Sequence, residues 1–177
     1  MALNGYVAHL IDHETFGLSS GVRNSGCSAA KSHCNVTAML YEMSKYPSLP
    51  TSLYGFSMGG LVLHTYLLRN PELHIAGAIF QCPFWNFPKE VEGREAKLVA
   101  IPLIAPAAED FLMMPKHITM QGLTADNGYC QHKITTMGSK GWPFSTPKGI
   151  AAMISEFDCV REKAHLFRHS MLMVLGG

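Results

Sequence analysis

The sequence has few charged residues and almost no net charge. Charged residues make up 15% of the 177 residues, and 14 basic side chains nearly balance 13 acidic ones. A balanced chain has no broad basic surface for nucleic acid, so we expect no nucleic-acid partner. Low charge together with an apolar fraction of 47% also argues against intrinsic disorder.

Cysteines are few and their spacing forms no known pattern. The five cysteines are scattered and contain no C-x-x-C motif: Cys27, Cys34, Cys82, Cys130 and Cys159. This spacing excludes a zinc ribbon and a thioredoxin motif, and a chain long enough for a sizeable core does not need a disulfide framework. We therefore predict reduced thiols, a cytoplasmic location, no metal and no cofactor.

The sequence also lacks a long apolar run. Residues 1–5 have neither the basic start nor the apolar stretch of a signal peptide. The most apolar stretch, residues 98–108, is interrupted by Pro102 and Pro106 and falls short of the roughly 18 residues that a membrane span needs. These absences predict a soluble protein.

Short apolar runs alternate with helical patterns along the chain. Runs at residues 6–11, 53–56, 75–80 and 171–175 are typical of buried strands. Apolar residues with helical spacing lie at 36–43 and 61–68, and prolines follow both stretches. The alternation predicts an α/β fold with a parallel sheet and right-handed crossovers.

Residues 84–168 break this alternation. Prolines recur through the segment, with short helix-like pieces between them, and Ala151, Ile154 and Phe157 indicate one helix. We interpret the segment as a mostly helical lid over the carboxyl end of the sheet, where parallel sheets bind ligands. The predicted organisation is therefore a core at 1–83, a lid or cap insertion at 84–168 and a returning core strand at 169–177.

A run of Gly-Phe-Ser-Met-Gly-Gly matches G-x-S-x-G, the nucleophile elbow. In this motif the chain turns from strand to helix so sharply that the serine backbone is strained, and larger side chains would collide at Gly55 and Gly59. Gly60 completes the elbow. Ser57 would be the nucleophile at the start of a helix, with the Met58 N–H directed at the developing oxyanion. The alternative is a glycine-rich turn with an incidental serine.

Together these features resemble the monoglyceride lipase and lysophospholipase-like branch of the α/β-hydrolases, often called serine aminopeptidase-like. The resemblance is carried by the elbow, by residues 79–83 and by residues 12–21, which are similar to a D-x-x-G-x-G-x-S-x-G loop. Thr15 departs from this loop pattern, because glycine usually stands there. The resemblance implies a partial α/β-hydrolase fold, with a parallel central sheet, flanking helices and a lid.

The resemblance also implies a serine hydrolase that cleaves carboxylic esters of lipids, monoacylglycerols or lysophospholipids, through an acyl-enzyme at Ser57. Its triad aspartate and histidine would lie beyond Gly177, and earlier strands would precede Tyr6. No aspartate of the chain matches the triad position, and Asp12 is expected to shape its own loop. The chain is thus expected to be incomplete, with activity belonging to a full-length parent.

By the same resemblance, the lid would supply an apolar channel for the acyl chain, and peripheral membrane contact through the lid is an open interpretation. The candidate lining residues are Phe84, Trp85, Phe111, Leu112, Met113 and Met114. Methionine suits variable acyl shapes, but clusters of this composition are as often ordinary core. Packing within the lid therefore remains an alternative for these residues.

Two other functions stay open. The chain could be a non-catalytic truncated or pseudo-hydrolase that binds lipid or a protein partner through the same pocket. It could also keep the chemistry but act on a peptide, a thioester or a small ester, because specificity lies in the lid. A haloalkane dehalogenase or epoxide hydrolase is disfavoured, because those relatives place aspartate at the elbow. The sequence specifies neither the acyl-chain preference nor the oligomeric state.

Overall fold

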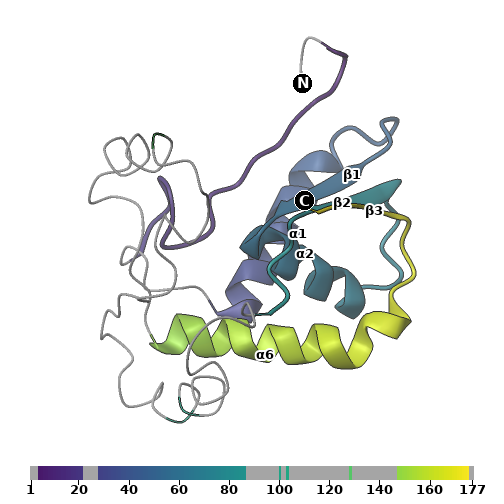
Figure 1. Ribbon diagram of the computed structural model, residues 1–177. Coiled ribbons are helices and arrows are strands. Elements are labelled where there is room, and N and C mark those ends of the chain that lie inside the picture. The colour runs from purple at the N-terminus through teal and green to yellow at the C-terminus, as the bar shows by residue number, and fades with distance from the viewer. Residues whose placement is uncertain are drawn as a thin grey trace. The chain divides into compact units, whose positions relative to one another are not determined.

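A computed structural model of the protein describes residues 4–21, 28–86, 100, 103, 128 and 147–175 (Figure 1). These residues belong to two compact units. The first contains residues 4–11, 29–86 and 155–175, and the second takes in the described residues from 12 to 28 and from 100 to 154. Each unit is described by itself below.

Three short parallel strands form the sheet of the first unit (Figure 1). They are β1 (Ser52–Phe56), β2 (Gly77–Gln81) and β3 (Met171–Val174), in the order β1-β2-β3. These strands confirm the predictions made from the apolar runs at 53–56, 75–80 and 171–175. Their parallel pairing confirms the predicted α/β class.

The two faces of this sheet differ in exposure. Leu53 and Phe80 are buried on one face. Tyr54 and Leu172 both align with Ile79 of β2, on the opposite face, and are 55% and 58% exposed. The helices of the first unit therefore cover one face of the sheet, and the core lies between that face and the helices.

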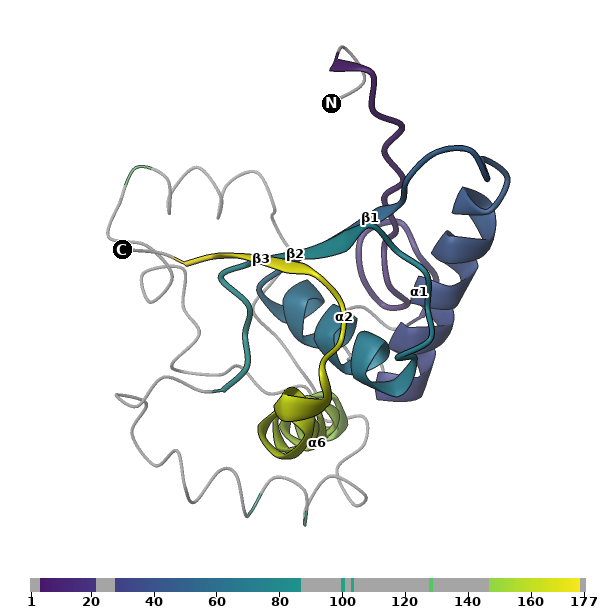
Figure 2. The same cartoon turned by 90° about the vertical axis from the view of Figure 1, so that its right-hand side faces the viewer.

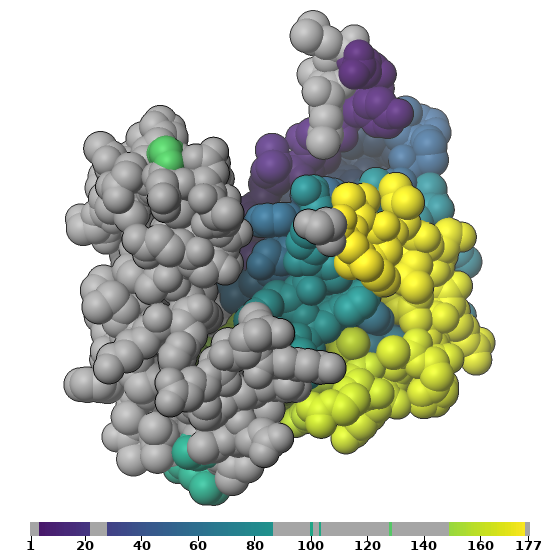
Figure 3. Space-filling view, in the orientation of Figure 1, coloured from purple at the N-terminus to yellow at the C-terminus, as the bar shows by residue number. Residues whose placement is uncertain are grey.

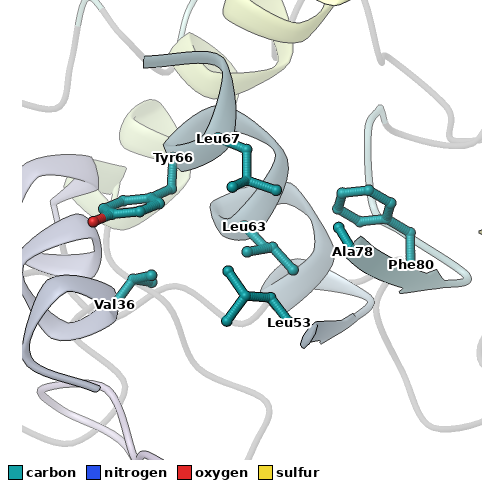
Figure 4. Close-up of a cluster of buried hydrophobic side chains, with 7 residues drawn as sticks. All are labelled: Val36, Leu53, Leu63, Tyr66, Leu67, Ala78 and Phe80. Carbon is teal, nitrogen blue, oxygen red and sulfur yellow. The ribbon is translucent and has the colours of Figure 1, made fainter. Parts of the chain in front are cut away.

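Helices α1 (Ala29–Met43) and α2 (Met58–Arg69) lie on the same side of the sheet (Figure 2). Both helices were predicted from the spacing of apolar residues, and both end before a proline, Pro47 and Pro71 respectively. Their buried side chains meet those of the strands in one cluster (Figure 4): Val36, Leu53, Leu63, Tyr66, Leu67, Ala78 and Phe80. This cluster is the hydrophobic core of the first unit.

A third long helix, α6 (Pro147–Lys163), confirms the helix predicted around Ile154 and Phe157. Ile150, Ile154 and Phe157 recur at helical spacing and are all buried. A short 3-10 helix, η3 (Ala164–Leu166), follows α6 and leads to β3. The yellow atoms of β3 lie at the molecular surface (Figure 3).

A partly buried ion pair joins α2 to the second half of α6, with Glu156 buried and Arg69 exposed. Nη1 and Nη2 of Arg69 donate to the two carboxylate oxygens of Glu156 at 2.7 and 2.9 Å. Burial alone would raise the pKa of Glu156, but hydrogen bonds from Arg69 and Thr65 and the charges of Arg69 and His33 outweigh it and lower the pKa. The pair therefore fixes this part of α6 against the end of α2.

The strand predicted at residues 6–11 is not formed, and that prediction was wrong. The segment is exposed, with Leu10 94% exposed, and is drawn in purple in Figure 1. No strand in the described part of the chain pairs with it, and an unpaired segment must leave its backbone polar groups in water. Its His9 ring still lies near the Tyr46 ring, at 5.9 Å between centroids.

The loop of residues 12–21 has a compact turn organised by Asp12. The Asp12 carboxylate accepts a hydrogen bond from the Leu18 N–H at 2.9 Å, and the Asp12 backbone carbonyl accepts one from the Ser19 hydroxyl at 2.6 Å. These bonds confirm the prediction that Asp12 shapes its own loop. Thr15, where glycine was expected, adopts a φ of 75° and still makes the turn. Gly17 has a φ of 51°, and a Cβ there would lie 2.1 Å from the Asp12 carboxyl, so a larger residue would strain the turn and displace the Asp12 side chain.

Candidate active site

Ser57 lies at the turn between β1 and α2, in a strained backbone conformation. Residues other than glycine rarely adopt its φ of 51° and ψ of −118°, and this conformation costs about 1–3 kcal/mol. The Ser57 N–H donates to the Gln81 carbonyl of β2 at 3.0 Å. The Ser57 carbonyl accepts from the N–H groups of Gly60, Leu61 and Phe84 at 3.0, 3.3 and 2.9 Å. These bonds hold the strained geometry in place.

Glycines allow the close approach of β1, α2 and the segment after β2. A Cβ at Gly55 would lie 2.8 Å from the Gly59 carbonyl oxygen, and a Cβ at Gly60 would lie 2.8 Å from the Pro83 Cβ. At Gly59 a Cβ meets nothing within 4 Å, so the crowding expected there is not found. Successive helix positions point roughly 100° apart, which is why Gly60 faces Pro83 and its neighbour does not.

These contacts separate the effects of alanine at the elbow glycines. Gly55→Ala and Gly60→Ala should each lower the free energy of unfolding by about 1–3 kcal/mol, because rigid backbone or ring atoms must move. Gly59→Ala should be neutral or stabilising by up to about 1 kcal/mol, because alanine is the better helix former. Urea unfolding of the three single variants measures these changes in the free energy of unfolding. If Gly59→Ala lost as much stability as Gly60→Ala, the close contact would not be specific to Gly60.

The first turn of α2 presents backbone donors beside Ser57. The N–H groups at the start of a helix have no acceptor within the helix. Those of Gly60 and Leu61 bond to the Ser57 carbonyl, whereas those of Met58 and Gly59 find no acceptor in the described part of the chain. They lie at the positive end of the helix dipole and can stabilise a negative oxygen that forms near Ser57.

No side chain among the described residues hydrogen-bonds to Ser57 Oγ. Four described histidines are candidates for a general base: His13, His64, His165 and His169. The His169 ring lies beside the Phe167 ring, at 5.6 Å between centroids. His13 lies in the loop of residues 12–21, where burial lowers its pKa more than the Asp12 charge raises it. His165 is exposed on η3, and His64 is buried in α2. The first unit therefore combines a strained serine with backbone donors, and no side chain among its described residues hydrogen-bonds to Ser57 Oγ.

His64 occupies an aromatic cluster further along α2. The residue is 4% exposed. Its ring centroid lies 5.4, 5.1 and 4.9 Å from those of Phe80, Trp85 and Phe167. Neither ring nitrogen has a hydrogen-bond partner in the described part of the molecule. Burial lowers the pKa of His64 from 6.5 to about 4, so the ring is neutral near pH 7.

Among the candidate lid residues, the structure describes Phe84 and Trp85. The Phe84 ring packs edge-to-face against Phe157 of α6, at 5.4 Å between centroids. Trp85 lies against His64 and Phe80. The remaining candidates and most of the predicted lid at 84–168 lie outside the described residues: Phe111, Leu112, Met113 and Met114. Sequence reasoning missed the Phe84 N–H as a partner of Ser57, because no residue pattern marks a backbone donor.

A metal or a membrane span finds no support in the part of the chain that is described. No group of three metal-ligating side chains occurs among those residues. None of the helices there has the length and apolar character to cross a bilayer. The described cysteines are unpaired: Cys34, Cys82 and Cys159.

Comparison with known proteins gives a family match and fold matches. The family model described as serine aminopeptidase, S33, matches residues 1–177. A search of curated proteins gives no match. The monoacylglycerol lipase of Paleococcus ferrophilus aligns with a TM-score of 0.75 and 15% identity, over 92% of this chain and 59% of its own.

A soluble variant of the monoglyceride lipase of Saccharomyces cerevisiae, in complex with a substrate analog, aligns similarly. Its TM-score is 0.72 at 16% identity, over 93% of this chain and 57% of its own. At such low identity these two matches show a shared fold. The chain spans less than two thirds of the length of either structure.

Proposed function

Since the chain belongs to the S33 serine aminopeptidase family and has the α/β-hydrolase fold, we propose that it is part of a serine hydrolase whose nucleophile is Ser57. The observation that carries the proposal is the strained backbone of Ser57 beside the N–H groups that begin α2. A strand-to-helix turn of this kind exposes a serine hydroxyl and offers donors to an oxyanion at the same point.

In the proposed reaction, Ser57 Oγ attacks the carbonyl carbon of an ester. The new Oγ–C bond gives a tetrahedral intermediate, whose negative oxygen accepts from the Met58 N–H. The C–O bond to the alcohol then breaks, and water later cleaves the acyl-enzyme. A histidine oriented by an aspartate would take the Ser57 proton and pass it to the leaving alcohol. We place both of these residues outside the described part of the chain.

For the substrate we propose a monoacylglycerol or lysophospholipid ester. Support comes from the names of the matched structures, a monoacylglycerol lipase and a monoglyceride lipase. The lid would supply the acyl channel and any peripheral membrane contact of a cytoplasmic protein. No cofactor takes part, because the triad chemistry needs none.

The experiment is labelling with a fluorophosphonate probe, followed by mass spectrometry of the labelled peptide. In the full-length protein the probe should attach to Ser57. The 177-residue chain alone should label slowly, because no side chain of its described residues hydrogen-bonds to Ser57 Oγ. Absence of labelling in the full-length protein, with lipid binding retained, would overturn catalysis and favour a non-catalytic binding module.

A further inference from the structure

We propose that Phe84 is a positioning residue for Ser57: its N–H holds the carbonyl of the strained serine, and its ring anchors that N–H to helix α6. The inference rests on the proposed function, because it concerns the geometry of the proposed nucleophile. It assigns Phe84 a role that does not depend on which acyl chain the protein takes.

The backbone bond is the first part of the argument. Gly60 and Leu61 bond to the Ser57 carbonyl from within the first turn of α2, so they fix Ser57 relative to its own helix. The Phe84 N–H, at 2.9 Å, ties the same carbonyl to the segment that follows β2. Rotation of that carbonyl is the ψ angle of Ser57, and the bond from Phe84 therefore helps to hold ψ at −118°.

The chain reaches this position through a second strained residue. Cys82 has a φ of 42°, and its N–H donates to the Val174 carbonyl of β3 at 2.7 Å. The left-handed turn at Cys82 directs the chain away from β2, and Pro83 then packs closely on Gly60. The segment before Phe84 is therefore held by β3 through Cys82 and by α2 through Pro83, and it places the Phe84 N–H beside the Ser57 carbonyl.

The ring is the second part of the argument. The Phe84 and Phe157 rings meet at 78°, an edge-to-face geometry that stabilises aromatic pairs. Phe157 is 1% exposed, and its neighbour Glu156 is held by the bidentate bond from Arg69. The contacts therefore run from Ser57 through Phe84 and α6 back to α2, which limits the motion of Phe84.

This arrangement places the two ends of the predicted lid against each other. Phe84 begins the segment 84–168, and α6 belongs to its end. A shift of α6 would move the Phe84 ring and with it the donor to the Ser57 carbonyl. A misplacement on the order of 1 Å at a reacting group can cost about 100-fold in rate.

The test compares variants that separate the ring from the backbone N–H in the full-length protein. Phe84→Ala keeps the N–H but loses the ring, and Phe84→Tyr keeps both. Val36→Ala is the matched control, because Val36 is a buried residue of the same unit in α1. The readouts are the rate of fluorophosphonate labelling at Ser57, deuterium exchange at the Phe84 amide, and Tm.

For Phe84→Ala we expect labelling to slow by about 10–100-fold and exchange at the Phe84 amide to become about tenfold faster. Phe84→Tyr should stay within about twofold of the unsubstituted protein in both readouts. Val36→Ala should lower Tm and leave the labelling rate unchanged well below its Tm. A control that slows labelling as much as Phe84→Ala, or a Phe84→Ala protein that labels normally, would overturn the proposal.

Should Phe84→Ala fail to fold, Phe157→Leu provides the same test with a smaller change in volume. It should slow labelling by about fivefold or more, and an unchanged rate would contradict the anchoring role. Failure of the proposed function is distinguishable, because then the unsubstituted protein does not label at all. Exchange at the Phe84 amide still decides in that case whether its ring holds the Ser57 turn.

Discussion

Replacing Ser57 by glycine should abolish the proposed ester hydrolysis and stabilise the protein at the same time. The loss of the proposed nucleophile should reduce kcat on the order of 10⁴–10⁶-fold in the full-length protein. Glycine adopts a φ of 51° without the steric cost that serine bears, so the strain of the turn disappears. Allowing for the greater freedom of glycine in the unfolded chain, we expect a net gain of about 1 kcal/mol in the free energy of unfolding.

Ser57→Ala is the matched comparison. Alanine removes the same hydroxyl but has a Cβ, so activity should fall equally while the strain persists. Ser52→Ala, at the start of β1, should change neither quantity by much. Hydrolysis of a soluble ester and urea unfolding measure the two effects. Equal stabilities of the glycine and alanine variants would contradict the strain, and residual activity in either would contradict the role of Ser57.

The elbow could be predicted from the sequence because its constraint is local. A strand, a serine between glycines and a helix all lie within one short stretch, and the structure places Ser57 in the expected turn. The crowding predicted at Gly55 is confirmed, but the crowding predicted at Gly59 is not found. The motif suggests Gly59, whereas the structure shows contact at Gly60, which depends on Pro83 from a different part of the chain.

Features that depend on distant partners could not be predicted. Residues 6–11 have the composition of a strand, but a strand needs a neighbour that accepts its hydrogen bonds. Arg69 and Glu156 lie 87 positions apart, and neither belongs to a pattern that signals the pair. The bond from Phe84 to Ser57 uses a backbone N–H, which every residue except proline has. Side-chain patterns carry no information about it.

The surroundings of His64 also depend on distant partners, and the protonation of His64 should have a large effect on stability. The apolar pattern at residues 61–68 predicts a helix that contains His64, but it does not predict an aromatic cluster in which neither ring nitrogen has a hydrogen-bond partner among the described residues. Because burial lowers its pKa to about 4, the folded protein binds the proton less readily than the unfolded chain, whose histidine titrates near 6.5. Stability should therefore be complete above pH 6.5 and decrease as the pH falls toward 4.

The expected loss from His64 is about 2 kcal/mol between pH 6.5 and 5, and about 3 kcal/mol by pH 4. Below pH 4.5, Glu156 also loses its stabilising charge, because its pKa is lowered in the folded protein. Urea unfolding between pH 7 and 5 therefore isolates the histidines.

The decisive variant is His64→Leu, which should retain or gain stability at pH 7, because it removes two buried ring nitrogens without partners. Its stability should change little between pH 7 and 5, apart from a smaller slope from His13, whose pKa burial also lowers. His165→Gln replaces an exposed histidine and should keep the slope of the unsubstituted protein. A His64→Leu protein with that same slope would show that the acid sensitivity arises elsewhere. A stability of His64→Leu that stays constant between pH 7 and 5 would show that the acid sensitivity arises at His64. The aromatic cluster around His64 would then depend on a neutral imidazole.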